Sequence, residues 1–276
     1  DTAVHMYDTI HAPKTDYNFA GTVENSAGEA FTFSTLSVNN KLTYRIDFKS
    51  ASGDTLYRSE KYPYTTSDGV LKNPRIGFNG MGFAHSKYHA VFSYTKNSVK
   101  DVKKLISVYS LNDEIYEVIP DLGAPRYYIQ TKVSLSAIDT TPQGFGSPLL
   151  YTLNLVGQQR IMNGMKIING SGYIVYQGSG SKVYIQKIDL NATSAQIAFT
   201  KNLDIISNSG DNAYYLGLWN NHLVYFIGKH VVKIDFAGNF TKQLGMQNSP
   251  SSLHSLIDNN MLHVVSSFQK TNGRYR

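Results

Sequence analysis

The chain has 276 residues, enough for one large domain or two small ones. Charged residues make up only 17% of it, against about 25% in an average soluble domain, so Ser, Thr, Asn, Gln and Tyr must supply much of the polar surface. Lys and Arg exceed Asp and Glu by six, which favours contact with anionic partners. No apolar run approaches the roughly 20 residues of a membrane-spanning helix, so membrane insertion is not expected.

The chain contains no cysteine, which excludes disulfides, iron–sulfur clusters, zinc ribbons and thiol nucleophiles. This absence does not identify the compartment, because a large extracellular or virion protein can rely on its core alone. The first residue is Asp1 rather than Met, which suggests a processed or excised piece.

Strand signals dominate the chain. Seven short segments are rich in β-branched and aromatic residues, and turn residues bound nearly all of them. They are residues 31–38, 41–48, 105–111, 173–177, 182–190, 222–227 and 261–268. Only residues 98–105 have a helical spacing of Val and Leu, and it is brief. The chain is therefore predicted to be all-β.

A turn recurs at regular intervals and leads into a strand each time. It is an Asn-Asn doublet at 39–40, 220–221 and 259–260, and related turns begin at 86 and 170. The span from 39 to 259 divides into five periods of about 44 residues if one degenerate repeat lies near residues 127–133. Asn and Gly supply the left-handed backbone conformation that tight hairpin turns require.

This all-β period resembles that of β-propellers, whose four-stranded blades repeat every 40–45 residues, and the resemblance covers nearly the whole chain. The Gly-His and Trp-Asp pairs of WD40 repeats and the Gly-Gly of kelch repeats are missing. Six turn positions imply a six-bladed β-propeller, with five blades as the alternative. The composition of the chain, free of cysteine and rich in Tyr, Asn and Ser, is similar to that of bacterial or phage surface proteins, including tail receptor-binding propellers.

The N-terminal residues 1–30 contain two strand-like stretches, 3–10 and 17–24, ahead of the first repeat. We expect this segment to complete the last blade and close the ring, which would hide edge strands. Residues 31–276 then form the propeller, and the whole chain is a single domain. The rival interpretation is that the chain stops inside blade six and that residues 1–30 link it to a preceding domain.

A basic loop is predicted at residues 95–104, between the second and third strands of a blade. Its lysines are Lys96, Lys100, Lys103 and Lys104, against the single acid Asp101. At the mouth of a ring such a loop is suited to gripping phosphate, sulfate or carboxylate groups. The alternative is a solvated lysine face. Nucleic acid is not the expected partner, because no aromatic or Arg side chain lies among these lysines.

A second candidate binding site is the only tryptophan, Trp219, with the neighbouring amides of Asn220 and Asn221. A tryptophan ring can stack on a sugar while amides bind its hydroxyls. The alternative is that Trp219 caps the packing of its own blade, since large aromatic side chains usually serve the core.

No catalytic, metal or cofactor site is predicted. His85 and His89 are the closest histidine pair, but they flank a turn and no metalloprotease-like acid lies between them. For a propeller glycosidase or lactonase the candidate acids are Asp121, Asp211 and Asp258, and Glu is absent after Glu117. This distribution argues against an enzyme.

The sequence therefore predicts a non-enzymatic binding module that recognises a cell-surface glycan or an anionic wall polymer, as a phage receptor-binding or bacterial adhesin domain does. It is expected outside the cell, on a cell surface or on a virion, alone or with other proteins of a larger assembly. A propeller glycoside hydrolase or lactonase and a protein–protein interaction scaffold are the alternatives.

Overall fold

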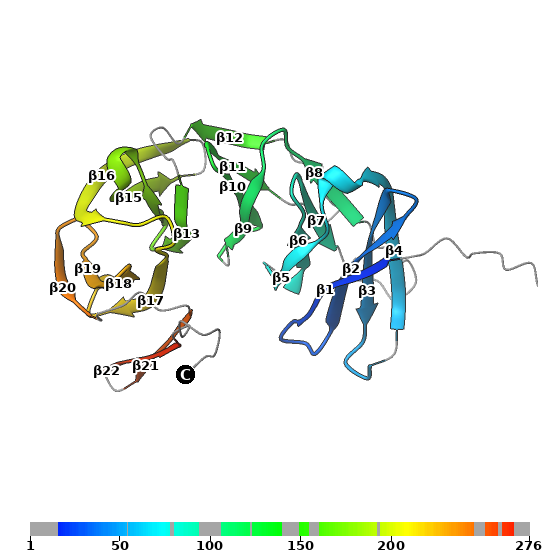
Figure 1. Cartoon of the computed structure of the whole chain (residues 1–276). Coiled ribbons are helices and arrows are strands. Elements are labelled where there is room, and N and C mark those ends of the chain that lie inside the picture. Colours follow the sequence, from blue (N-terminus) through cyan, green and yellow to red (C-terminus); the bar gives the residue numbers. More distant parts are fainter. Residues whose placement is uncertain are drawn as a thin grey trace, which may run out of the picture. The chain divides into compact units, whose positions relative to one another are not determined.

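A computed structural model of the chain describes residues 16–53, 55–77, 80–93, 106–121, 123–139, 149–154, 160–191, 194–245, 252–258 and 261–267 (Figure 1). Strands dominate these residues, and the predicted all-β class is confirmed. The seven predicted strand segments all lie on strands. Among the described residues no helix has the length and apolar character that crossing a membrane would require. The helical spacing at 98–105 falls outside the described residues.

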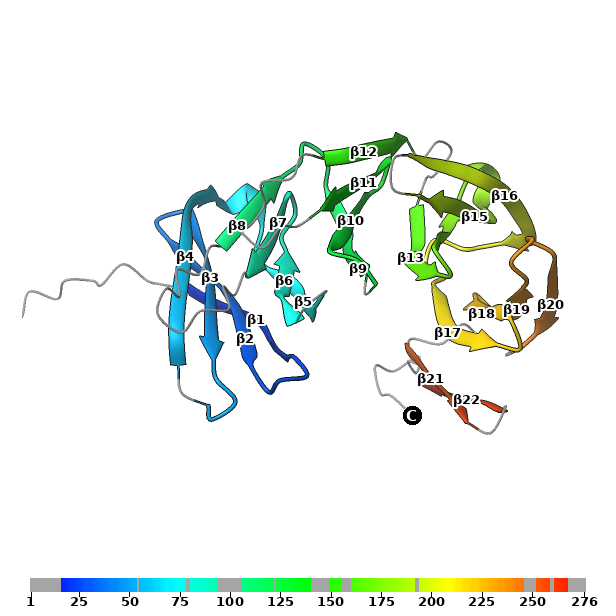
Figure 2. The same cartoon turned by 180° about the vertical axis from the view of Figure 1, so that it is seen from behind.

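The strands form antiparallel sheets in which chain neighbours are also sheet neighbours, as in propeller blades (Figure 2). The first sheet is β1 (Asp16–Glu24), β2 (Ala30–Val38), β3 (Lys41–Lys49) and β4 (Thr55–Thr65). The short 3-10 helix η1 (Thr66–Asp68) follows it. The second sheet is β5 (Lys72–Ile76), β6 (Gly82–His85), β7 (His89–Ser93) and β8 (Ile106–Ser110). The third is β9 (Ile115–Asp121), β10 (Arg126–Thr131), β11 (Ser134–Asp139) and β12 (Leu149–Asn154).

The remaining sheets continue this plan. The fourth is β13 (Arg160–Ile168), β14 (Ser171–Gln177), β15 (Lys182–Leu190) and β16 (Ala195–Ile206), with the 3-10 helix η3 (Ser179–Ser181) before β15. The fifth is β17 (Ala213–Trp219), β18 (His222–Ile227), β19 (His230–Ile234) and β20 (Phe240–Leu244). The described strands of the sixth are β21 (Ser252–Asp258) and β22 (Met261–Ser267).

The contacts divide the chain into two compact units. Unit 1 comprises residues 1–131 and 135–152, and unit 2 comprises residues 132–134 and 153–276. In each unit the hydrophobic cores lie between successive sheets. In unit 1 one core joins the first and second sheets and another the second and third. In unit 2 one core joins the fourth and fifth sheets, and a smaller one joins the fifth and sixth.

The predicted turn chemistry is confirmed at three hairpins. Both residues of each two-residue turn have a positive φ, which Asn and Gly tolerate and β-branched residues do not. The turns are Asn39–Asn40 (φ 50° and 61°), Asn220–Asn221 (48° and 60°) and Asn169–Gly170 (50° and 71°), the last of which begins one residue before the predicted start at 170. The degenerate repeat near residues 127–133 is also a hairpin, between β10 and β11.

The repeated turn does not join the same two strands in every sheet, and in this respect the sequence interpretation is wrong. In unit 1 the repeated turn joins the second and third strands of a sheet, as at β2–β3, whereas in unit 2 it joins the first and second, as at β17–β18. The physical reason is that β1 pairs with β2 and adds a strand ahead of the first repeat. The strands β8 and β9, although consecutive in the chain, belong to different sheets.

The N-terminal segment is described in part. The strand-like stretch at 17–24 lies in β1, in the first sheet, while the stretch at 3–10 is outside the described residues. Closure of a ring by residues 1–30 and a single domain over 31–276 stay predictions. The described residues form five four-stranded sheets and one two-stranded sheet.

The left-handed turn of the fifth sheet gives a direct test of this assignment. Replacing Asn221 (φ 60°) with Val should lower the free energy of unfolding by about 1–2 kcal/mol, because a β-branched residue is strained there. Asn221→Gly should leave stability unchanged or raise it. Urea unfolding measures both changes, with Asn18→Val on exposed β1 as the control, expected to stay within about 0.5 kcal/mol. Equal stability of the two Asn221 variants would contradict the turn.

Candidate functional site

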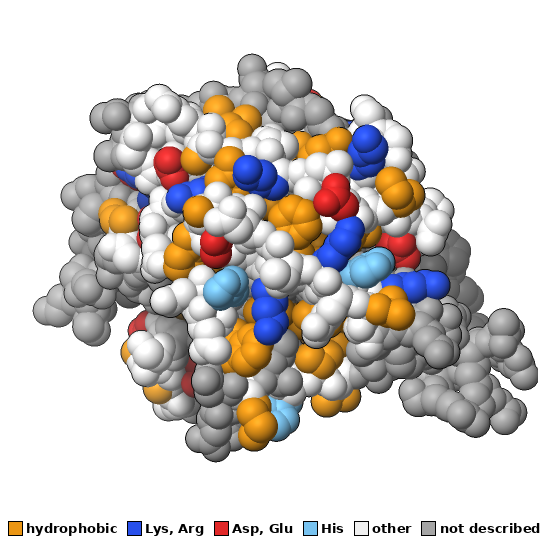
Figure 3. Space-filling view, turned by 90° about the vertical axis from the view of Figure 1, so that its left-hand side faces the viewer, with side chains coloured by type: hydrophobic (Ala, Val, Ile, Leu, Met, Phe, Trp, Pro, Cys, Tyr) orange, Lys and Arg blue, Asp and Glu red, His pale blue; other side chains and the backbone are white. Residues whose placement is uncertain are grey.

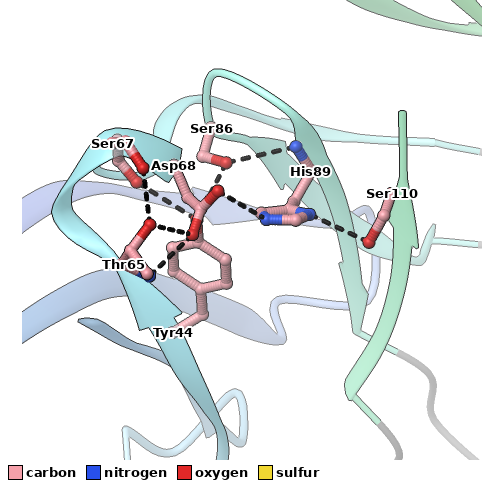
Figure 4. A network of polar contacts seen from close by, with 8 residues as sticks. Tyr44, Thr65, Ser67, Asp68, Ser86, His89 and Ser110 are labelled. Atoms are coloured by element: carbon pink, nitrogen blue, oxygen red, sulfur yellow. Dashed lines mark hydrogen bonds and ion pairs between the residues drawn. The ribbon is translucent and has the colours of Figure 1, made fainter. Parts of the chain in front are cut away.

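A cluster of polar side chains lies in unit 1, where the first and second sheets pack together (Figure 4). We call it the Asp68 cluster. Its members come from β3, the end of β4, η1, the β6–β7 turn, the start of β7 and the end of β8. They are Tyr44, Thr65, Ser67, Asp68, Ser86, His89 and Ser110.

The carboxylate of Asp68 is held by the start of η1. Its Oδ2 accepts hydrogen bonds from the backbone N–H of Thr65 at 2.6 Å and from the Thr65 hydroxyl at 2.8 Å, and the first of these is one half of the capping box at the start of η1. Burial alone would raise the pKa of Asp68, but these hydrogen bonds and the nearby His89 lower it below its ordinary value. Asp68 is therefore ionised and fixed in position at neutral pH.

The imidazole of His89 links Asp68 to Ser110. Its Nδ1 lies 3.0 Å from the Ser110 hydroxyl, and its Nε2 lies 3.5 Å from Asp68 Oδ1. At 3.5 Å the second contact is longer than an ordinary hydrogen bond and is electrostatic. Burial lowers the pKa of His89, although Asp68 opposes this effect, so the ring is neutral at pH 7. The carboxylate favours the proton on Nε2, and Nδ1 then accepts a hydrogen bond from Ser110.

Two tyrosines fix the position of the His89 ring. The Tyr64 and His89 ring centroids are 4.6 Å apart, and Tyr64 stacks on Tyr44 at 4.5 Å. The Tyr44 hydroxyl lies 2.9 Å from the Ser86 hydroxyl and 3.1 Å from the carbonyl of Gly69, and it can donate to either. Burial raises the pKa of Tyr44, so its hydroxyl remains a neutral donor.

The histidine pair His85 and His89 is not arranged to share a metal. His85 Nδ1 lies 2.9 Å from the carbonyl of Ser86, and its Nε2 lies 3.3 Å from the Asn73 amide, whereas His89 faces Asp68 and Ser110. Among the described residues no group of three or more His, Cys, Asp and Glu is placed to hold a metal ion.

The Trp219 hairpin lies in unit 2. The half-buried indole packs against a small core that contains Val224 and Phe226, and the ammonium of Lys233 lies 4.0 Å from its ring centroid. Packing against the core agrees with the capping alternative for Trp219. Lys233 is a neighbour that the sequence interpretation missed, because it lies on β19, in register with Val224 of β18.

The other predicted residues are placed as follows. Asn220 and Asn221 make the left-handed turn, and ligand binding by them and Trp219 stays a prediction. Lys96, Lys100, Lys103 and Lys104 lie outside the described residues, in the segment between β7 and β8. That segment joins the third and fourth strands of its sheet, so the predicted position between second and third strands is wrong.

The candidate hydrolase acids whose side chains the structure describes accept hydrogen bonds from backbone N–H groups of their own turns. Asp121 Oδ1 accepts a hydrogen bond from the backbone of Gly123 at 2.9 Å, and Asp211 Oδ2 accepts one from Asn208 at 2.8 Å. The side chain of Asp258 is outside the described residues.

The net positive charge of the chain belongs entirely to unit 2. Unit 2 contains 12 Lys and Arg against five Asp and no Glu, a net charge of +7, whereas unit 1 contains 14 against 15, a net charge of −1. Seen from the side of β16 and β20, Lys and Arg side chains lie scattered among hydrophobic and uncharged ones (Figure 3). The absence of Glu after Glu117 is visible in the sequence, but the segregation of charge is not, because the boundary between the units depends on contacts in the folded chain.

Comparisons with known proteins identify no family. No family model matches the chain, and no curated protein matches it either. Among solved structures the chain is similar to the WD40 domain of SCAP from fission yeast, with a TM-score of 0.41 and 11% sequence identity. The match covers 90% of this chain and 69% of that one.

The buried imidazole of His85 makes stability depend on pH. Burial lowers its pKa from 6.5 to about 4, so between these pH values His85 is protonated in the unfolded chain and neutral in the folded one. The free energy of unfolding is therefore highest above about pH 6.5 and decreases as the pH falls toward 4. Between about pH 7 and pH 4.5 the parent should lose about 2 kcal/mol more than His85→Gln.

Urea unfolding at the two pH values measures this loss. The control is His254→Gln, at an exposed position of β21, which should lose as much stability as the parent. If His85→Gln loses as much as the parent, His85 is not the group responsible.

Proposed function

We propose that unit 2 of the chain is a non-enzymatic binding module that recognises an anionic polymer, such as an acidic glycan of a cell surface. The observation that carries this proposal is the segregation of charge, +7 on unit 2 against −1 on unit 1. A surface with this excess of cations attracts polyanions over the Debye length and speeds their association.

The distribution of the unit 2 cations supports a long ligand rather than a compact one. Lys182, Lys201 and Lys229 are exposed on strands or turns of the fourth and fifth sheets. Two of the five acids of this unit, Asp211 and Asp235, accept hydrogen bonds from backbone N–H groups of their own turns. Scattered cations match the repeated charges of a polymer better than a single small anion.

The Trp219 hairpin is a suitable place for a sugar unit of such a polymer. The Lys233 ammonium over the indole brings a positive charge next to an aromatic surface, the combination that an acidic sugar requires. We also propose that the sheets close into a six-bladed propeller and that the protein acts outside the cell or on a virion. The succession of blade-like meander sheets supports the first of these.

Salt-dependent binding tests the role of unit 2. The variant Lys182→Gln, Lys201→Gln, Lys229→Gln removes three exposed charges, and the matched control removes three from unit 1, Lys41→Gln, Lys49→Gln, Lys72→Gln. Heparin is the probe and uncharged dextran its control, at about 50 and about 300 mM NaCl. The unit 2 variant should bind heparin several-fold more weakly at low salt and nearly as well as the parent at high salt, while the unit 1 variant should bind as the parent does.

The basic loop is tested in the same experiment with Lys96, Lys100, Lys103 and Lys104 changed to Ala. A loss of binding confined to this quadruple variant would place the ligand on the loop and contradict the assignment to unit 2. Equal binding of the parent and the unit 2 variant at low salt would contradict it as well. Binding of dextran as strongly as heparin would show that charge does not select the ligand.

A further inference from the structure

Ser110 is one of the exposed residues of the Asp68 cluster, with Thr65 and Ser67. Ser110 is exposed at the end of β8, while its partner His89 is buried, with a relative exposure of 8%. We propose that Ser110 is a nucleophile that His89 activates as general base, and that it accepts acyl groups from activated carboxylic esters. This activity is independent of the proposed anion binding, which concerns unit 2 only.

The sheet register brings the nucleophile and the base together. His89 and Ser110 are directly paired residues of β7 and β8, so their side chains leave the same face of the sheet. The 3.0 Å between Ser110 Oγ and His89 Nδ1 is within the range for a nucleophile and its base. Figure 4 shows the serine hydroxyl directed at the ring.

The third group of the arrangement is Asp68, on the opposite nitrogen. Its carboxylate, 3.5 Å from His89 Nε2, favours the tautomer whose unprotonated Nδ1 faces Ser110. The same carboxylate stabilises the imidazolium that forms when the ring takes a proton. Asp68 touches neither the ester nor the serine, so it is a positioning residue.

The rest of the cluster keeps this geometry ready before an ester arrives. Thr65 holds Asp68 through two hydrogen bonds, and Tyr64 packs against the imidazole. The backbone N–H of His89 donates to the Ser86 hydroxyl at 3.2 Å, which anchors the start of β7. Preorganisation of this kind is what a weak nucleophile such as a serine hydroxyl needs.

The chemical step balances without a further reactant. Ser110 Oγ forms a bond to the ester carbonyl carbon while its proton passes to His89 Nδ1. The bond from that carbon to the alkoxy oxygen then breaks, and the leaving alcohol takes the proton from the imidazolium. Water attacks the acyl-serine by the same route, which releases the carboxylic acid and restores the hydroxyl.

Incubation of the full chain with p-nitrophenyl acetate tests the proposal, with nitrophenolate release followed by absorbance and the acetylated residue located by mass spectrometry. Ser110 should become acetylated in the parent and in the control Ser52→Ala, which changes an exposed serine of another turn. The Ser110→Ala change should abolish this adduct while the circular dichroism spectrum stays that of the parent. His89→Gln should slow acetylation on the order of 100-fold, the usual contribution of a general base.

The role of Asp68 requires a readout that a purely structural role would not move. In the parent the acetylation rate should rise with pH and level off by pH 7, because burial keeps the pKa of His89 below its ordinary value. Asp68→Asn should slow acetylation and change this profile while the circular dichroism spectrum stays that of the parent. Absence from the folded parent of both acetyl-Ser110 and nitrophenolate release that depends on Ser110 would overturn the proposal, and so would equal acetylation of Ser110 in His89→Gln.

Discussion

Each central strand of this protein has to bury both of its faces, and this constraint organises the rest of the structure. The sheets stack so that one hydrophobic core lies between each successive pair within a unit. Four middle strands, β7, β11, β14 and β18, are accordingly buried almost without interruption rather than at alternate positions. The outermost strands of the fourth and fifth sheets, β16 and β20, are mostly exposed.

Burial on both faces also decides what polar groups in the interior must do. A polar side chain between two sheets loses water and needs a partner, or it costs free energy. Three such side chains, those of Tyr44, His85 and Ser86, lie where the first and second sheets meet. The Ser86 hydroxyl accepts hydrogen bonds from the Tyr44 hydroxyl and from the backbone N–H of His89, and His85 Nδ1 pairs with the Ser86 carbonyl. The Asp68 cluster thus has a structural role in satisfying the interior as well as the chemistry proposed for its exposed end.

The strands and turns could be predicted from sequence because their signals are local. A two-residue turn with both φ values positive favours Asn or Gly. The Asn39–Asn40 and Asn220–Asn221 doublets meet this requirement with two adjacent residues, which can be recognised in the sequence. The same signal does not say which strands of a sheet the turn joins. Pairing of β1 with β2 decides that, and it depends on residues outside the repeat.

The Asp68 cluster could not be predicted for a different physical reason. Asp68, His89 and Ser110 are about twenty residues apart along the chain, and only the pairing of β7 with β8 and the position of η1 bring them together. His85 is close to His89 in sequence but takes no part in the pairing with Ser110, because the two rings face different partners. Likewise Lys233 reaches Trp219 only through the pairing of β18 with β19.

Burial of the middle strands restricts where this protein can meet a ligand, and the proposed sites obey that restriction. Ser110 lies on β8, the fourth strand of its sheet, and Lys201 lies on β16, the fourth strand of another. Trp219 is the last residue of β17 and directly precedes the Asn220–Asn221 turn. Within the described residues β7, β11, β14 and β18 offer no exposed side chain to a polymer or an ester, so outer strands, strand ends and turns carry the chemistry while these strands hold them in place. Changes in charge or nucleophile on the outer strands therefore leave the cores between the sheets intact, and for that reason the surface variants can report on binding and reactivity separately from folding.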